Sequence, residues 1–402
     1  MITERSKSII LLTGYLPGSD KKLKPLSTLE WNKLASWLHK RELMPEDLTG
    51  VNQEKILNEW DDFKILKDRL MGLLGRGATM AICLDKWQRA GVWLINRSEA
   101  DYPTEYKIAL IHKAPPIFYG IGNRKLLITD AVGVVGSRNI TEEELSYAHR
   151  LGKRISDEGY SVISGGAKGI DENSMLGALE NEGTCIGILA DRLLQRSTSK
   201  IYRRHIMDNN LVLLSPYHPE ARFNVGNAMS RNKFIYIKSK ATFVVHSGTK
   251  GGTWTGAEEN LKYKWVPIYV KMNNYPDSGN RALLKLGATK LRDNISEIDF
   301  KFDGLKKEKL VSQSDLFSKV EESNNSEYTD VAEKSAKEKV IDNPILLKLL
   351  ELLRDDFKEG FTKKEVAKHY DVLPSQMKKW LKILEDKNCV LLESADRYKL
   401  QE

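Results

Sequence analysis

Seven short apolar runs, separated by helical stretches and glycine-containing turns, constrain the fold of this chain more than any other feature of its sequence. They lie between about residues 91 and 270 and read VWLIN, VGVVGS, YSVISG, TCIGIL, LVLLS, ATFVVHS and WVPIYV. Strands that alternate with helices pair in parallel, because each crossover helix returns the chain to the same end of the sheet. We therefore expect an α/β fold with a doubly wound, mostly parallel sheet.

The regions on either side of the α/β pattern differ from it in the spacing of their apolar residues. In residues 1–90, apolar side chains recur at three- and four-residue steps, which predicts a helical N-terminal domain. Two such series are Leu29, Trp31, Leu34, Trp37 and Leu38, and Ile56, Trp60, Phe63 and Leu66. The α/β domain is expected over residues 91–300. The segment 301–340, rich in Ser, Asn, Glu and Lys, is typical of a flexible linker.

Residues 341–402 return to helical periodicity and end in two short runs joined by a turn. A helix, a turn, a second helix and a strand-turn-strand ending form the pattern of a winged-helix domain. Lys378, Lys379 and Lys382 share the polar side of the second helix. The lysines are compatible with two functions. Either the helix enters a groove of duplex DNA, or its polar side is the solvated face of a protein-interaction module, and the sequence does not distinguish the two.

The bulk properties of the 402 residues narrow the classes of function. A formal net charge of +8 favours a polyanionic partner. Three cysteines, far apart and without a CxxC pair, indicate neither a zinc site nor a disulfide framework, so no metal is expected. The apolar run that begins at Ile9 is too short for a signal peptide, and no run is long enough to span a bilayer. We expect a cytoplasmic protein with no membrane partner.

The first candidate binding feature is the turn after VGVV, which contains Gly136, Ser137 and Arg138. A helix follows, with Thr141 and Glu144 spaced as a capping box. A glycine-ended strand that enters a helix presents backbone N–H groups to a phosphate, and an arginine there can hold phosphate oxygens bidentately. Taken alone, the segment also fits an ordinary strand-to-helix turn with a surface arginine.

A second turn of the same kind follows YSVIS, with Gly165 and Gly166 before Lys168. Neither turn matches GxGxxG or the P-loop pattern, so no nucleotide cofactor is expected. Turns that follow neighbouring parallel strands meet at the carboxyl edge of the sheet, where such folds bind ligands. Together the two turns predict an anion site at that edge.

Two later segments are expected at the same edge. SRNKF places Arg231 and Asn232 at a predicted helix start, and HSGTKGG places Ser247 and Gly248 after a strand. Glu258 and Glu259, in the second turn of the following helix, are either catalytic toward a bound nucleotide or simply solvated.

The order of motifs from about residue 90 to residue 270 carries a family resemblance. The motifs are DYP at Asp101, APPIFYGIGN from Ala114, VGSR from Val135, SGGAKGID from Ser164, SRNKF from Ser230 and SG at Ser247. In this order they resemble the DprA/Smf family of DNA-processing proteins. The resemblance implies a Rossmann-like domain that binds single-stranded DNA without sequence preference, forms a homodimer and loads a RecA-type recombinase. On this basis we expect a protein that is not an enzyme.

The resemblance also assigns residues. The implied DNA or phosphate contacts are Gly136, Ser137, Arg138, Gly165, Gly166, Lys168, Arg231, Asn232, Ser247 and Gly248. The segment STSKIYRRH aligns with a DNA-contacting loop and adds Lys200, although the usual Tyr-Pro pair is absent. The chain also departs from the family at Ser174 and Met175, at Ala228, and at Lys271 and Met272. The implied role is to protect single-stranded DNA and load the recombinase in DNA uptake and natural transformation, recombination, repair, or mobile-element and defence contexts, and the departures point to a divergent member of the family.

Two other functions remain open. The segment GGTWTGAE, from Gly251 to Glu258, approximates the GGxGTxxE motif of lysine-decarboxylase-like phosphoribohydrolases. That similarity implies a nucleotide-processing enzyme or nucleotide sensor in which Glu258 acts on a ribosyl bond and Arg138 holds the phosphate. The third function is transcription regulation through the winged helix.

Overall fold

The computed structural model describes residues 2–138, 140–272 and 278–302, and, nearer the C-terminus, residues 361, 362, 365, 366, 381, 384, 390–394 and 397–400. The chain divides into two compact units, Met1–Glu321 and Glu322–Glu402. Of the predicted linker at 301–340, only Lys301 and Phe302 are described, and Phe302 is buried.

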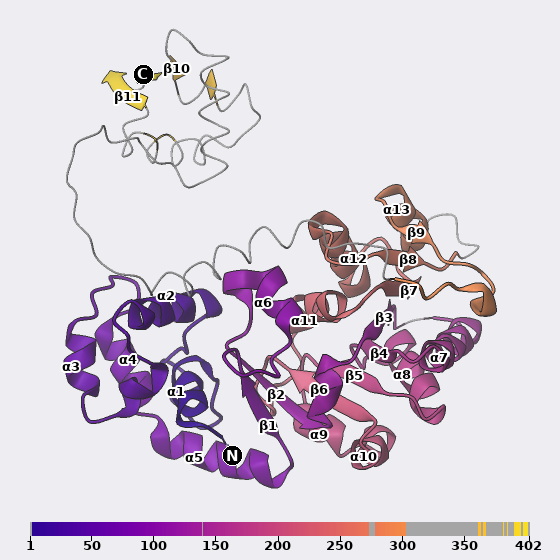
Figure 1. Cartoon of the computed structure of the whole chain (residues 1–402), viewed down its shortest axis with the longest axis horizontal. Coiled ribbons are helices and arrows are strands. Elements are labelled where there is room, and N and C mark those ends of the chain that lie inside the picture. Colours follow the sequence, from indigo (N-terminus) through magenta and orange to yellow (C-terminus); the bar gives the residue numbers. More distant parts are fainter. Residues whose placement is uncertain are drawn as a thin grey trace, which may run out of the picture. The chain divides into compact units, whose positions relative to one another are not determined.

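A nine-stranded sheet forms the centre of the first unit, in the order β1-β2-β6-β5-β4-β3-β7-β8-β9 (Figure 1). The strands are β1 (Trp93–Asn96), β2 (Ile117–Gly122), β3 (Ala131–Gly136), β4 (Ser161–Ser164), β5 (Cys185–Ile188), β6 (Leu211–Ser215), β7 (Thr242–His246), β8 (Ile268–Val270) and β9 (Thr289–Lys290). In sheet order, the seven strands β6-β5-β4-β3-β7-β8-β9 are parallel to one another. Strand β2 pairs antiparallel with β1 and with β6. All seven apolar runs form strands, so the predicted mostly parallel sheet is confirmed.

Strand β2 has no counterpart among those seven runs. It contains Gly120, which stands opposite Trp93 of β1. A Cβ atom at Gly120 would lie 2.2 Å from the Trp93 ring, so the cross-strand indole requires a glycine here. The glycine interrupts the apolar run IFYGIG and weakens its strand signal.

Helices cover both faces of the sheet because alternate strand residues point to opposite sides. Val134 of β3 packs in one apolar cluster and Val135 in the other. The helices of the first cluster are α7 (Glu142–Asp157), α8 (Ile170–Glu180), α9 (Leu193–Ser197) and α10 (Lys200–Met207). Those of the second are α6 (Thr104–Leu110), α11 (Val225–Lys238), α12 (Gly252–Tyr263) and α13 (Gly279–Lys285). None of the described helices is long and apolar enough to cross a membrane.

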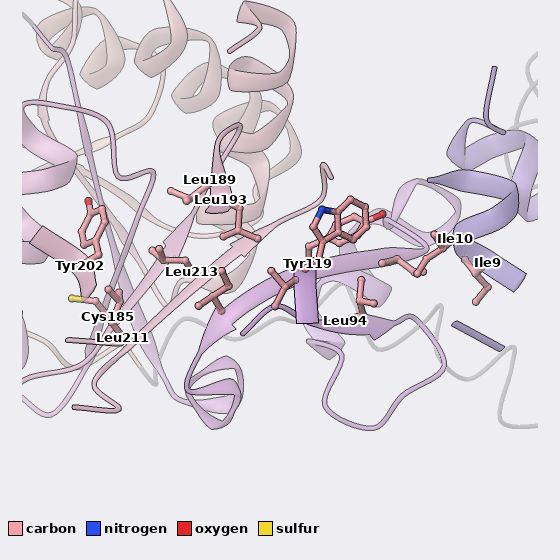
Figure 2. Close-up of a cluster of buried hydrophobic side chains, with 14 of the residues drawn as sticks. Ile9, Ile10, Leu94, Tyr119, Cys185, Leu189, Leu193, Tyr202, Leu211 and Leu213 are labelled. Carbon is pink, nitrogen blue, oxygen red and sulfur yellow. The ribbon is translucent and has the colours of Figure 1, made fainter. Parts of the chain in front are cut away.

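The N-terminal region is helical, as predicted, and shares its core with the sheet. Its helices are α1 (Glu4–Thr13), α2 (Thr28–His39), α3 (Gln53–Asn58), α4 (Lys67–Leu74) and α5 (Gly77–Arg89). Figure 2 shows Ile9 and Ile10 of α1 at one end of a buried cluster that runs past Tyr119 of β2 toward Tyr202 of α10. The core therefore continues across the boundary expected at residue 90.

Part of the predicted helical pattern is wrong. In α2, Trp31, Leu34 and Leu38 are buried, but Leu29 is exposed. The second series does not lie on one helix. Helix α3 ends at Asn58 and α4 begins at Lys67, so the residues between them form a loop. Phe63 and Leu66 are exposed there.

In the second unit, the described strands form a three-stranded antiparallel sheet in the order β10-β12-β11. Its strands are β10 (Phe361–Thr362), β11 (Val390–Ser394) and β12 (Arg397–Leu400). The pairing of β11 with β12 matches the strand-turn-strand ending of the predicted winged helix. Lys378, Lys379 and Lys382 lie outside the described residues.

Candidate functional site

The path of the chain reverses across the sheet at β3, and this reversal creates a crevice. From β3 the chain proceeds through β4, β5 and β6 on one side, whereas β7 pairs on the other side of β3. In doubly wound sheets, the loops after two such strands diverge and leave room for a ligand. The two loops here contain residues 136–138 and 247–251.

Among the cavities along this carboxyl edge, two adjoin the glycine turns. The larger, of about 610 Å³, is lined from both diverging loops, by Gly136 and Ser137 on one side and Gly248 on the other; we call it the switch-point cavity. The smaller, of about 310 Å³, is lined by Gly165 and Lys168; we call it the Lys168 cavity. The two cavities share Arg138, Ala167, Phe223, Ala228 and Arg231.

Four exposed cations line the cavities, each from a loop after a different strand. Arg138 follows β3, Lys168 follows β4, Arg192 follows β5 and Lys250 follows β7. Within the described part of the chain, none of the four forms a salt bridge with a carboxylate. Asp191 and Asp171 also line the cavities, but the cations outnumber these carboxylates, so the edge of the sheet presents an excess of positive charge.

The buried carboxylate of Asp171 connects the two glycine turns. One oxygen accepts from the Gly136 N–H at 3.3 Å, and the other accepts from the Gly165 N–H at 3.2 Å. Burial raises the pKa of Asp171, and the nearby Arg231 and the backbone amides oppose that shift. The expectation that these glycine amides are free for a phosphate is wrong, because Asp171 already occupies them.

Arg231 is also buried, under the same turn. Its Nη1 donates to the Ile188 carbonyl at 2.6 Å, and a Cβ atom at Gly165 would lie 1.8 Å from that nitrogen. Burial lowers its pKa, which the Asp171 carboxylate partly offsets. The expected helix start at Arg231 is wrong, since α11 begins at Val225 with Asn224 as its N-cap.

Asn232, one residue further along α11, has a structural contact of its own. Its Nδ2 donates to the Gly252 carbonyl at 2.9 Å and so holds the start of α12 beside α11. Asn232 also lines the switch-point cavity, as Arg231 does.

The two helix N-termini nearest the switch point differ in charge. The predicted capping box at Thr141 and Glu144 is present, and α7 has three glutamates in its first turn. Glu144 also contacts Nδ1 of His246 at 2.6 Å. Because carboxylates already occupy that end of α7, it offers little to a further anion. The first turn of α12 contains no acidic residue, and Gly252 lines the switch-point cavity.

The remaining predicted residues are spread more widely. Ser137 donates its backbone N–H to the His246 carbonyl at 3.0 Å, and Gly166 has a φ of +61° in the second turn. Ser247 is buried, with its N–H bonded to Asn280, and lines neither cavity. Lys200 is exposed at the start of α10 and also lines neither cavity.

The residue that a phosphoribohydrolase would need lies away from both cavities. Glu258 is exposed on α12 and lines neither of them, although Gly251 and Gly252 of the same segment line the switch-point cavity. This placement gives the alternative enzyme no catalytic carboxylate from that motif.

Sequence reasoning missed Arg192, Lys250 and Phe223. Arg192 and Lys250 follow the carboxyl ends of predicted strands, as Arg138 does, so the same rule would have found them. Phe223 lies in the loop between β6 and α11, where no periodicity or motif distinguishes it.

Comparison with known proteins covers the α/β region. A family model described as "DNA recombination-mediator protein A" matches residues 93–300. The DNA processing protein DprA of Bacillus subtilis is 27% identical over 183 residues, which are 44% of this chain and 60% of that protein. DprA of Streptococcus pneumoniae is 26% identical over 163 residues, 40% of this chain and 56% of that protein. The chain thus matches less than two thirds of either relative's length.

The fold has a counterpart of known structure. The crystal structure of DprA from Streptococcus pneumoniae superimposes with a TM-score of 0.57 at 19% sequence identity, covering 74% of this chain and 99% of that one. The Rossmann-like architecture is therefore shared.

Proposed function

The chain belongs to the DNA recombination-mediator protein A family, also called DprA/Smf, and from this we propose that it binds single-stranded DNA along the carboxyl edge of its sheet. The strand's phosphates lie near Arg138, Lys168, Arg192 and Lys250. Binding is independent of sequence, because contacts to phosphates carry no base information.

One observation carries this proposal: four exposed cations without salt bridges, from the loops after β3, β4, β5 and β7, surround two adjoining cavities in the described part of the chain. A row of cations along a groove suits a phosphate backbone. The cavities are concave and of nucleotide size, so a flexible strand can follow them, whereas a stiff duplex cannot bend into them.

The direct test is a comparison of ligands by fluorescence anisotropy at low salt. We expect the protein to bind labelled oligo-dT more tightly than a duplex of the same length. Equal or tighter binding of the duplex would contradict the proposal and move attention to the C-terminal unit.

We further propose that the protein acts as a homodimer and loads a RecA-type recombinase on the strand it holds. Two grooves on one strand raise the effective concentration of the second contact, which compensates for a short binding site. Light scattering at micromolar concentration is expected to give twice the monomer mass, and the protein is expected to stimulate strand exchange by the recombinase. A monomer, with and without DNA, would contradict the dimer.

We also propose that the protein is not an enzyme. Two observations support this: Glu258 is exposed and lines neither cavity, and Asp171, which lines the switch-point cavity, has both oxygens occupied by the Gly136 and Gly165 amides. The purified protein is expected to release no base from nucleoside monophosphates. Release that disappears in Glu258→Gln would overturn this.

A further inference from the structure

We propose that Phe223 is a stacking platform for a nucleobase of the bound strand. This inference rests on the single-strand binding proposed above. The cations can hold phosphates, whereas the apolar wall of the crevice would hold a base by stacking.

Phe223 occupies the junction of the two cavities. Its side chain is exposed, at 46%, and it lines both the switch-point cavity and the Lys168 cavity. Val225 and Met229, also exposed, line the switch-point cavity beside it. These three residues form an exposed apolar ledge on the rim of a crevice that Arg138 and Lys250 also line.

The occupant of this ledge follows from the groups around it. The Arg138 guanidinium carbon lies 5.5 Å from the centroid of the Phe223 ring, and Lys250 lines the same cavity as the ledge. A ligand that fits here combines negative charge with a flat apolar surface. A nucleotide has both, with its phosphate attracted to the cations and its base free to pack on the ring.

The loop holds Phe223 in place before any ligand arrives. Two residues before it, the Ala221 carbonyl accepts the Arg192 N–H at 2.8 Å. Directly after it, the Asn224 side chain accepts the Asn227 N–H at 3.1 Å and caps α11. Because the backbone is fixed on both sides, stacking on the ring requires little further ordering of the loop.

A single exposed phenylalanine needs no functional explanation by itself, and the chain supplies a comparison. Phe63 is 82% exposed and has the Lys64 ammonium 5.3 Å from its ring centroid. Phe63 lines neither the switch-point nor the Lys168 cavity. Phe223 differs in its position between two cavities, within an apolar ledge and among cations from four loops.

The side chains of the ledge also predict that the site does not discriminate between bases. Phe223, Val225 and Met229 present no strong hydrogen-bond donor or acceptor from their side chains. Stacking on such a surface accepts every base, since each has a π face. The contact therefore adds affinity for bases without adding a sequence preference.

The test separates stacking from phosphate contact by removing the bases. Binding of labelled oligo-dT and of a length-matched abasic strand is measured for the parent, Phe223→Ala, Phe223→Trp and the control Phe63→Ala, with melting curves to verify folding. We expect Phe223→Ala to weaken oligo-dT binding about tenfold and to weaken abasic binding much less, by no more than the loss of the Arg138 contact with the ring. Phe223→Trp and Phe63→Ala are expected to bind as the parent does.

Two results would overturn the stacking role while single-strand binding stands. One is an equal loss of affinity for both strands in Phe223→Ala, and the other is no loss for either. If the parent itself binds neither strand, the proposed function fails, and the stacking role fails with it.

Discussion

The guanidinium carbon of Arg138 lies 5.5 Å from the centroid of the Phe223 ring. The loop after β3 thus places its cation on an aromatic ring from the loop after β6. An arginine that rests on a ring loses less side-chain freedom when it contacts a phosphate, because part of that freedom is already lost. The contact therefore prepares Arg138 for its proposed partner.

Asp171 is expected to be the residue on which the shape of the crevice most depends. Asp171→Ala removes the acceptor of the Gly136 and Gly165 amides. It also removes a negative charge near the buried Arg231 guanidinium. We predict a loss of about 3 kcal/mol in the free energy of unfolding, measured by urea titration. Asp171→Asn, which keeps one oxygen, should lose less. Parent-like stability of Asp171→Ala would show that these hydrogen bonds contribute nothing.

Gly165→Ala is predicted to destabilise the protein by about 2 kcal/mol or more. The new methyl group would lie 1.8 Å from Nη1 of Arg231, which must then leave the Ile188 carbonyl. The matched control is Gly77→Ala in α5, where no atom lies within 4 Å of the added Cβ. That control should be neutral or slightly stabilising. Equal melting temperatures for the two variants would refute the predicted clash.

A pH dependence is predicted in the N-terminal region. Arg69 donates to both oxygens of Glu30, at 2.7 and 3.1 Å, and lowers the pKa of Glu30 to about 2. Because the folded-state pKa is depressed, the stabilisation is complete above the unfolded pKa and is lost as pH falls toward 2.

We therefore expect Glu30→Gln to cost about 1 to 2 kcal/mol at pH 7, with the difference from the parent closing between about pH 5 and pH 2. Urea titrations across this range measure it. The control is Glu59→Gln, whose exposed ion pair with Arg41 spans 3.4 Å and should contribute less than about 0.5 kcal/mol. A pH-independent difference would contradict the assignment.

Truncation distinguishes the two units. A chain that ends at residue 321 keeps the whole first unit, and we expect it to bind oligo-dT as the full chain does. A chain that ends at residue 299 also loses Phe300 and Phe302, which pack against Tyr160 and Phe243. It should unfold at least about 3 kcal/mol more easily. Loss of most oligo-dT affinity in the 321-residue chain would place the main binding site in the second unit.

Much of the fold follows from local sequence. The strands β3 to β8 are continuous apolar runs bounded by turns, and burial on both faces requires such runs. The reversed strand β2 is hidden because Gly120 makes room for Trp93 across the strand pair, a relation that sequence order does not reveal. Phe63 and Leu66 fit a helical period by chance, in a loop that leaves them exposed.

The sequence predicts where the candidate site lies in the fold better than it predicts the contacts that the site residues form. Arg138 and Lys168 were identified because each follows a strand with a glycine turn. The role of Asp171 depends on two turns that meet only after β3 and β4 pair, so no local signal shows it. The burial of Arg231 depends on the packing of α11 over the sheet. Asparagine is a favoured N-cap residue, so Asn224 indicates the true start of α11 in the sequence itself.

In the proposed complex, phosphates of a single strand contact Arg138 and Lys168. Arg138→Glu combined with Lys168→Glu replaces two attractions with two repulsions, and both side chains are exposed, so the fold should persist. The charge-matched control is Lys40→Glu with Lys285→Glu, two exposed lysines that line neither cavity. The control is expected to retain most of the parent's affinity.

The deciding measurement is a salt titration of fluorescent oligo-dT binding to the parent, the two double variants, and Arg138→Ala and Lys168→Ala. We predict near loss of binding in the Arg138/Lys168 double variant. Each alanine variant should reduce the slope of log affinity against log salt by about 0.7, the value for one phosphate contact on a single strand. Parent-like affinity and slope in the folded Arg138/Lys168 double variant would contradict the claim and remove the DNA path from this edge of the sheet.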